Sequence, residues 1–136
     1  MILAVFLSGC GSSGIITPST NLTGNWTMTN SSSSGVTTSK CNIVDSSGSL
    51  TIYNIDIVGD ESKDWNTGYG TFSGSTISAS VSGSYANIYY QTVSTTVYFE
   101  GTIDSSGIYG TGTWVQTYNV SANFYSYTGT TIFTKG

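Results

Sequence analysis

The sequence predicts an all-β fold: an eight-stranded antiparallel up-and-down barrel, with a two-sheet β-sandwich as the alternative. Three observations support this prediction. About a third of the 136 residues are Ser or Thr, and Tyr, Val and Ile are frequent, a composition typical of strands. Clusters of Gly, Asn, Asp and Ser interrupt the chain at short intervals, as turns do. No window holds apolar residues at helical spacing without such a cluster breaking it.

The first two expected strands lie on either side of a Ser-rich loop. Residues 22–30 are predicted to be a strand, because Trp26 and Met28 alternate with threonines and so share one face. Residues 36–44 follow as a second strand. The sequence Asp-Ser-Ser-Gly at residues 45–48 then predicts a turn, since Asp favours its first position and Gly its last.

The third expected strand, residues 49–58, changes face midway. Leu50 and Ile52 have one parity and Ile55 has the other, although all three are apolar. Because side chains alternate strictly along a regular strand, one face cannot bury all of them. A β-bulge near residues 53–54 would correct the parity, so we expect one there.

The second half of the chain contains the remaining strands and repeats the same turn. Asp-Ser-Ser-Gly recurs at residues 104–107, and Gly-Ser at residues 74–75 joins two short strands in a hairpin. Residues 83–90 show no clear alternation. The expected strands are residues 69–73, 76–82, 93–103, 108–118 and 124–135. Such a meander closes into a barrel whose interior has room for side chains or one small ligand.

Charge and composition exclude several functions. The net charge is −4 with three Lys and no basic cluster, so nucleic-acid binding has no electrostatic basis. The chain has no His, and therefore no such base to activate a Ser, Thr or Cys nucleophile. Asp56 and Glu100 are weak acid–base candidates: Glu100 falls on an outer face, whereas Asp56 would be internal only if the bulge turns it inward. We expect no enzymatic activity and no cofactor.

Metal binding is also poorly supported. The acidic loop at residues 59–64 offers carboxylates that suit Ca²⁺, but it lacks the Asp-x-Asp-x-Asp-Gly spacing, so a solvated loop is the preferred interpretation. Transition metals would require His or several Cys. Cys41 is expected to be a small buried residue, with a disulfide to Cys10 as the competing interpretation.

Aromatic residues are the strongest pointer to a function. Tyr has an apolar face and a hydroxyl group, a combination that suits sugars, peptides and small aromatic ligands. The alternative is that these residues fill the core and favour strands. The candidate ligand-binding residues are Trp114, Tyr118, Tyr90 and Phe99. The wider aromatic set also includes Trp65, Tyr85, Tyr89, Tyr98, Tyr125 and Tyr127.

The chain opens on an apolar run that ends in Leu7-Ser8-Gly9-Cys10, followed by a Gly/Ser-rich stretch. This pattern resembles the lipobox of bacterial lipoproteins, in which the cysteine is acylated and becomes the mature N-terminus. The resemblance implies a signal remnant at residues 1–9, lipid attachment at Cys10 and a flexible tether at residues 10–21. A short buried strand is the alternative interpretation of the apolar run.

The first residues of the chain differ from the lipoprotein pattern in one respect, and the residue after Cys10 indicates a location. No Lys or Arg occurs before Lys40, so the basic segment that normally precedes the apolar run is missing. Gly11 stands where inner-membrane lipoproteins carry a retaining Asp. The resemblance therefore implies attachment to the bacterial outer membrane.

A second resemblance involves both ends of the predicted barrel domain, residues 22–136. Gly24-Asn25-Trp26 opens the first strand, and Lys135 closes the last. This is similar to the calycin pattern of lipocalins, fatty-acid-binding proteins and avidins, and it implies a cation–π pair between Lys135 and Trp26. The alternative is a plain core indole and a solvated lysine. Avidins carry a polar residue where this chain has Met28, so the resemblance implies an architecture and not a ligand.

Together these features predict a non-enzymatic, membrane-anchored module that binds a small ligand or a surface. Its expected partners are the membrane, reached through the lipid, and a small molecule or carbohydrate. The alternative is a structural protein of the cell envelope or extracellular surface, whose strands pair with other subunits. A cavity of several hundred Å³ lined by Tyr and Trp favours binding. A filled interior with a long unpaired edge favours assembly.

Overall fold

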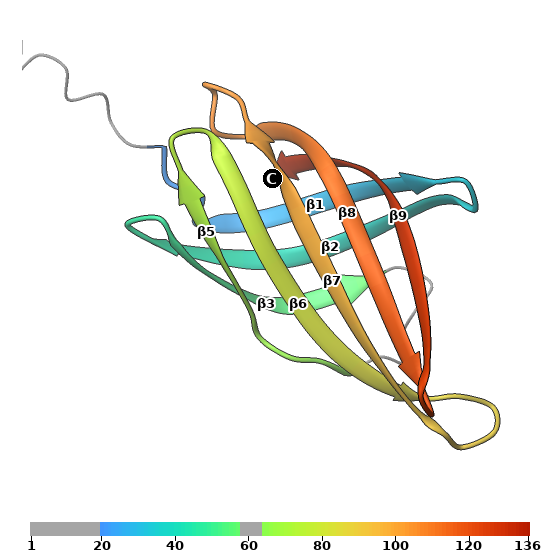
Figure 1. The fold of residues 1–136 in the computed structure, drawn as a ribbon. Coiled ribbons are helices and arrows are strands. Elements are labelled where there is room, and N and C mark those ends of the chain that lie inside the picture. The colour runs from blue at the N-terminus through green and yellow to red at the C-terminus, as the bar shows by residue number, and fades with distance from the viewer. Residues whose placement is uncertain (1–19, 58–63) are drawn as a thin grey trace, which may run out of the picture.

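The computed structural model describes residues 20–57 and 64–136, and within these ranges every regular element is a β-strand (Figure 1). The strands are β1 (Gly24–Ser32), β2 (Gly35–Ser46), β3 (Ser49–Ile57), β4 (Asp64–Trp65), β5 (Gly68–Ser73), β6 (Thr76–Ala86), β7 (Thr92–Ile103), β8 (Tyr109–Val120) and β9 (Asn123–Lys135). This part of the chain contains no helix long and apolar enough to cross a membrane.

The strands form a closed antiparallel up-and-down barrel. The order along the sheet is β4-β6-β5-β3-β2-β1-β9-β8-β7, and pairing of β6 with β7 closes the circle. Eight strands make the wall. The ninth, β4, pairs with β6 beside Gly83 and Ser84, beyond the end of the β5–β6 ladder. The predicted barrel is therefore confirmed, and the sandwich alternative is wrong because β6 and β7 pair along their whole length.

The barrel interior is a packed apolar core. Alternate residues of each strand turn inward, as the buried pattern of β7 illustrates with Val97, Phe99 and Ile103. Phe99 and Phe133 meet edge to face, with ring centroids 6.4 Å apart. The space left among the core side chains measures about 30 Å³, far below the several hundred Å³ of a ligand pocket. The core is thus filled.

The expected bulge is present on β3. The β2–β3 register passes from Asn42 opposite Tyr53 to Lys40 opposite Asp56, so two residues of β3 face the single residue Cys41. Asn54 has a left-handed backbone with φ of 50°. The bulge brings Ile55 against the core behind Leu50 and Ile52, as predicted. Asp56 nevertheless remains exposed, so it does not turn inward.

Leu22 plugs one end of the barrel, and we call this the plugged end. Leu22 is fully buried, and its amide donates to Asp45 Oδ2 (3.0 Å). The other carboxylate oxygen of Asp45 accepts from the Gly48 amide (2.8 Å) in the first Asp-Ser-Ser-Gly turn. The indole N–H of Trp26 donates to the Leu22 carbonyl (2.7 Å). One aspartate and one indole therefore hold the plug in place.

The last strand ends beside the first at this plugged end. Lys135 of β9 lies opposite Trp26 of β1 in the sheet register. Its ammonium group donates to the Asn21 carbonyl (3.0 Å), and its stem lies over Gly24, where an added Cβ would stand 2.8 Å from Lys135 Cε. In the structure, the Lys135 ammonium group therefore forms a hydrogen bond to the Asn21 carbonyl.

Candidate ligand-binding site

The end opposite the plug is open, because the wall is uneven there. Pairing between β1 and β9 stops at Ser31 and Thr130, whereas β8 and β9 stay paired as far as Val120 and Asn123. Strands β6 to β9 therefore run on past the filled core, while the β1–β2 hairpin diverges from them (Figure 1).

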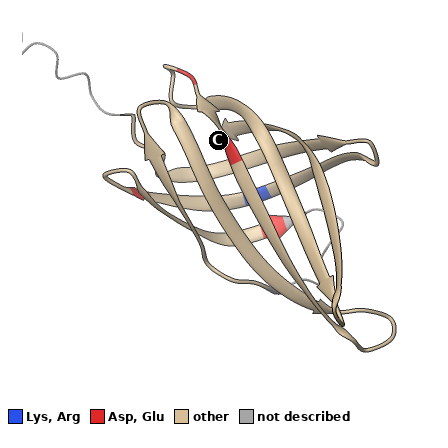
Figure 2. Cartoon of the chain, viewed as in Figure 1, with Lys and Arg blue, Asp and Glu red and all other residues tan. Residues whose placement is uncertain are grey.

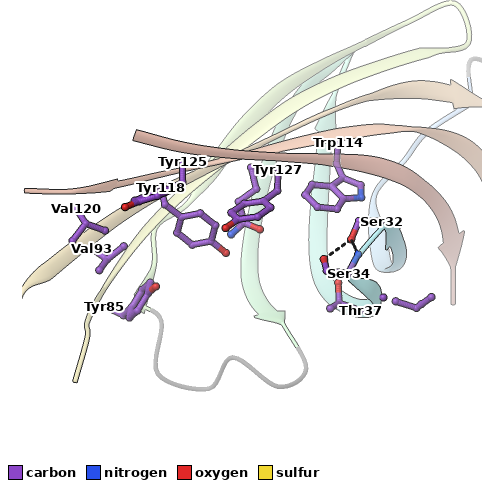
Figure 3. A pocket seen from close by; sticks show the side chains of 13 residues that line it. Ser32, Ser34, Thr37, Tyr85, Val93, Trp114, Tyr118, Val120, Tyr125 and Tyr127 are labelled. Carbon is purple, nitrogen blue, oxygen red and sulfur yellow. Dashed lines mark hydrogen bonds between the residues drawn. The ribbon is translucent and has the colours of Figure 1, made fainter. Parts of the chain in front are cut away.

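A cavity of about 530 Å³ lies between these two extensions, and we call it the cup. Side chains of β6, β7, β8 and β9 face the β1–β2 hairpin across it (Figure 3). Its volume is in the range of ligand pockets. The lining residues are Ser32, Ser34, Gly35, Val36, Thr37, Tyr85, Val93, Trp114, Gln116, Tyr118, Val120, Tyr125 and Tyr127.

Tyrosines form most of the aromatic wall. Tyr118 of β8 lies opposite Tyr125 of β9, and Gln116 lies opposite Tyr127. The rings of Tyr118 and Tyr127 meet edge to face, with centroids 5.8 Å apart and an interplanar angle of 81°. Tyr125 and Tyr127 are each 51% exposed, because no described strand pairs with β9 beyond Thr130 on this side. Their rings are therefore open to a ligand.

Trp114 stands at the inner limit of the cup and is the most buried aromatic residue in its lining. Its indole N–H donates to the Thr130 carbonyl (3.1 Å), and its own carbonyl accepts from Thr128 Oγ1 (2.9 Å). The indole lies against Gly129, the residue of β9 that is opposite Trp114 in the sheet register. Because the N–H is already bonded, Trp114 offers a ligand its ring.

A layer of buried polar residues separates the cup from the apolar core. The Gln116 side-chain NH₂ group donates a hydrogen bond to Thr95 Oγ1 (3.1 Å). This bond fixes the carboxamide and leaves its oxygen as a hydrogen-bond acceptor. Asn30 donates to Ser39 Oγ (3.3 Å). Thr131 lies opposite Asn30 in the sheet register. Within the described ranges, Asn30 Oδ1 and Thr131 Oγ1 have no hydrogen-bond partner.

Among the residues that the structure describes, the lining of the cup contains no charged side chain. Glu100 lies on the outer face of β7, and the coloured charges in Figure 2 lie away from the lower parts of β6 to β9. At the mouth of the cup, the Ser32 and Ser34 hydroxyls form a hydrogen bond with each other (2.8 Å). The cup thus presents ring faces, hydroxyls and one carboxamide.

The four predicted ligand-binding residues do not all meet. Trp114 and Tyr118 line the cup. Phe99 lies opposite Trp114 in the register, but it belongs to the filled core. Tyr90 is 94% exposed in the β6–β7 loop, with φ of 59°, and is not part of the lining.

Selection by residue type missed several members of the site. Tyr85, Tyr125 and Tyr127 belong to the wider aromatic set, and Gln116 is not aromatic. Their positions in the strands were the missing signal. Tyr125 and Tyr127 have the parity of buried Phe133, and Gln116 has the parity of Trp114, so all face inward.

The weaker candidates for chemistry stay apart from the cup. Glu100 and Asp56 are exposed on the outside. Among the residues that the structure describes, no group of His, Cys, Asp and Glu could hold a metal ion. The candidate calcium loop at residues 59–64 lies outside the described residues, apart from the backbone of Asp64 in β4.

Cys41 is a free thiol buried in the wall of the core. Burial raises the pKa of Cys41 to about 12, because the thiolate would lose its hydration. The nucleophilic form is therefore scarce at neutral pH. Cys41 behaves as the small buried residue that the sequence predicts.

Comparison with known proteins adds no relative: no protein-family model, no curated protein and no solved structure matches this chain.

Proposed function

We propose that this chain is a non-enzymatic binding module that holds a small, uncharged ligand in the cup. The observation that supports this proposal is an open, aromatic cavity of about 530 Å³ over a filled core. The core retains about 30 Å³, so inside the described barrel a ligand has room at the open end and not among the core side chains. The described lining residues can hydrogen-bond and stack, and they include no carboxylate, His or Cys that would transfer a proton or attack a carbonyl.

The proposal includes attachment to the bacterial outer membrane through a lipid on Cys10. The sequence Leu7-Ser8-Gly9-Cys10 supports it, with Gly11 in the following position. The burial of Cys41 is compatible with it, because a Cys10–Cys41 disulfide would have to reach a sulfur inside the wall. Cys10 would then be left for acylation.

We also propose that the barrel is of the calycin kind. Trp26 and Lys135 lie opposite one another on the first and last strands, and the Lys135 stem covers Gly24. These are the positions named by the G-x-W resemblance. The Trp26 indole N–H donates a hydrogen bond to the Leu22 carbonyl. Trp26 therefore stabilises the plugged end and does not contact the ligand.

Ligand binding is tested by fluorescence of the domain from residue 20 onward, with a neutral apolar dye as probe. Binding in the cup quenches or shifts Trp114 emission, and Tyr127→Ala weakens it. Tyr69→Ala is the matched control, because Tyr69 is exposed on the outside of β5. A dye that binds both variants equally would place its site elsewhere and contradict the proposal.

Lipid attachment is tested separately on the full chain expressed in a Gram-negative bacterium. Mass spectrometry of the purified protein is expected to show cleavage before Cys10 and added acyl chains. Cys10→Ser is the control that abolishes both. An unmodified Cys10 in membrane fractions would contradict the anchor while leaving the binding proposal intact.

Assembly is the second candidate function, and one observation favours it. Residues 123–129 of β9 pair with β8 on one side and with no described strand on the other. This edge has no Lys, Pro or bulge to block pairing. If copies pair there, light scattering will report a dimer that Ser126→Pro disrupts. A monomer at high concentration would contradict assembly through this edge.

A further inference from the structure

We infer that the ligand class of the cup is a neutral saccharide, bound as a short chain of sugar rings. This inference rests on the proposed function, because it names the ligand of the same cavity. Three properties of the lining support it: the ring faces, the hydrogen-bonding groups between them, and the absence of charge from its described residues.

The ring faces are arranged along a line and not around one point. Trp114 and Tyr118 occupy the same face of β8, four residues apart, which is roughly 13 Å along a strand. Tyr125 and Tyr127 run beside them on β9. Aromatic rings pack well against the apolar C–H faces of sugars, and a row of them fits several rings in succession.

The spaces between the rings are polar. Gln116 lies between Trp114 and Tyr118 on β8, and its carboxamide is held by Thr95. Across the cup, Ser32 and Ser34 present hydroxyls from the β1–β2 hairpin (Figure 3). A polyhydroxylated ligand can both donate to and accept from such groups, which is how a mostly apolar pocket orients a polar ligand.

The same features argue against other small ligands. An acyl chain needs an enclosed apolar tunnel, whereas the enclosed core space is about 30 Å³ and the cup is open. An anionic or cationic ligand would lose hydration without meeting an opposite charge among the described lining residues. Asn30 and Thr131, which have unpaired oxygens beneath the cup, also favour a polar environment over a hydrocarbon one.

The test is a titration of the domain from residue 20 onward with neutral di- to hexasaccharides of glucose, mannose, galactose and N-acetylglucosamine. Tryptophan fluorescence and chemical-shift changes in ¹H–¹⁵N spectra report binding. At least one series is expected to bind, with affinity that rises with chain length. A uronic-acid oligomer of equal length is expected to bind more weakly.

Variants locate the site without depending on Trp114, whose loss risks the fold. Tyr127→Ala and Gln116→Ala are each expected to weaken saccharide binding by about tenfold, and Tyr69→Ala to leave it unchanged. If no saccharide binds while an apolar dye still binds the cup, the saccharide inference is overturned and the proposed function stands. If neither binds the folded domain, both are overturned. Binding that Tyr127→Ala and Gln116→Ala leave intact overturns the cup as the saccharide site.

Discussion

The indole of Trp114 occupies the space that a side chain on Gly129 would need. A Cβ built on Gly129 would stand 2.8 Å from Trp114 Nε1 and would overlap the carbonyl oxygen of Ser31. Gly129 therefore permits two things at once: the last pairing of β9 with β1, and the seating of Trp114 at the inner limit of the cup. A glycine in a strand interior often marks such a close approach.

Gly129→Ala is expected to destabilise the domain by about 1–3 kcal/mol, the usual cost of overpacking. Part of that cost comes from moving the Ser31 carbonyl, because a backbone group cannot rotate away as a side chain can. Denaturant unfolding measures the change, and tryptophan emission should shift to longer wavelength as Trp114 moves toward water. Gly136→Ala is the control, since a Cβ there meets no atom within 4 Å. Equal stability of the two variants would show that the contact is not as tight as described.

Asp45→Ala is expected to destabilise the domain more than Asp104→Ala, although both open an Asp-Ser-Ser-Gly turn. Asp45 is buried and accepts from the Leu22 and Gly48 amides, whereas Asp104 is exposed and accepts within its own turn from Ser106. Leaving a buried amide unpaired costs about 1–3 kcal/mol. Thermal unfolding of both variants ranks them, and the reverse order would contradict the role of Asp45 at the plugged end.

Cys41 is expected to resist alkylation in the folded domain. With its pKa raised to about 12, the thiolate is a very small fraction of Cys41 at pH 8, and the sulfur is also buried. Iodoacetamide labelling followed by mass spectrometry should show slow modification that becomes fast in denaturant. Rapid labelling of the native domain at pH 8 would mean that the wall opens around Cys41.

The raised pKa of Cys41 also predicts how the free energy of unfolding changes in alkaline solution. The pKa of Cys41 is higher in the folded chain than in the unfolded chain, so between pH 9 and about 12 the folded state binds more protons. The contribution of Cys41 is therefore complete below pH 9 and is lost as the pH rises toward 12. Cys41→Ala should show a shallower loss of unfolding free energy over that range than the native sequence. Parallel curves would contradict the linkage.

Lys135→Ala is expected to lower the melting temperature more than Lys135→Met. Methionine keeps an unbranched stem over Gly24 and loses only the hydrogen bond to Asn21, whereas alanine loses both. If instead a cation–π contact with Trp26 dominated, the two variants would be equally destabilised. Differential scanning calorimetry at one pH separates these results.

The fold was predictable because local and long-range signals agree. Alternation placed Trp26, Met28, Val97 and Phe99 inward, and the parity change in β3 located the bulge near Asn54. The short strand β4 was not predictable, since two residues carry no period. The continuation of β6 to Ala86 was also missed, because Gly83 and the serines around it hide the alternation.

The cup was only half predictable, and the reason is geometric. Sequence identifies which residues face inward, but not where along the barrel the interior stops being filled. That depends on where β1 leaves β9, after Ser31 and Thr130. Phe99 and Trp114 are neighbours in the register and both belong to the core cluster, yet only Trp114 also lines the cup.

The first described residue, Thr20, touches the turn between β7 and β8, where a Cβ on Gly107 would stand 2.6 Å from its Cγ2. The chain thus enters the barrel beside the plug, at the end remote from Trp114 and Tyr118. Any surface to which the preceding residues are fixed would be joined to the molecule at this end. The tyrosines lie at the opposite end, so the point of attachment leaves the mouth of the cup free and a ligand could approach it from bulk solvent.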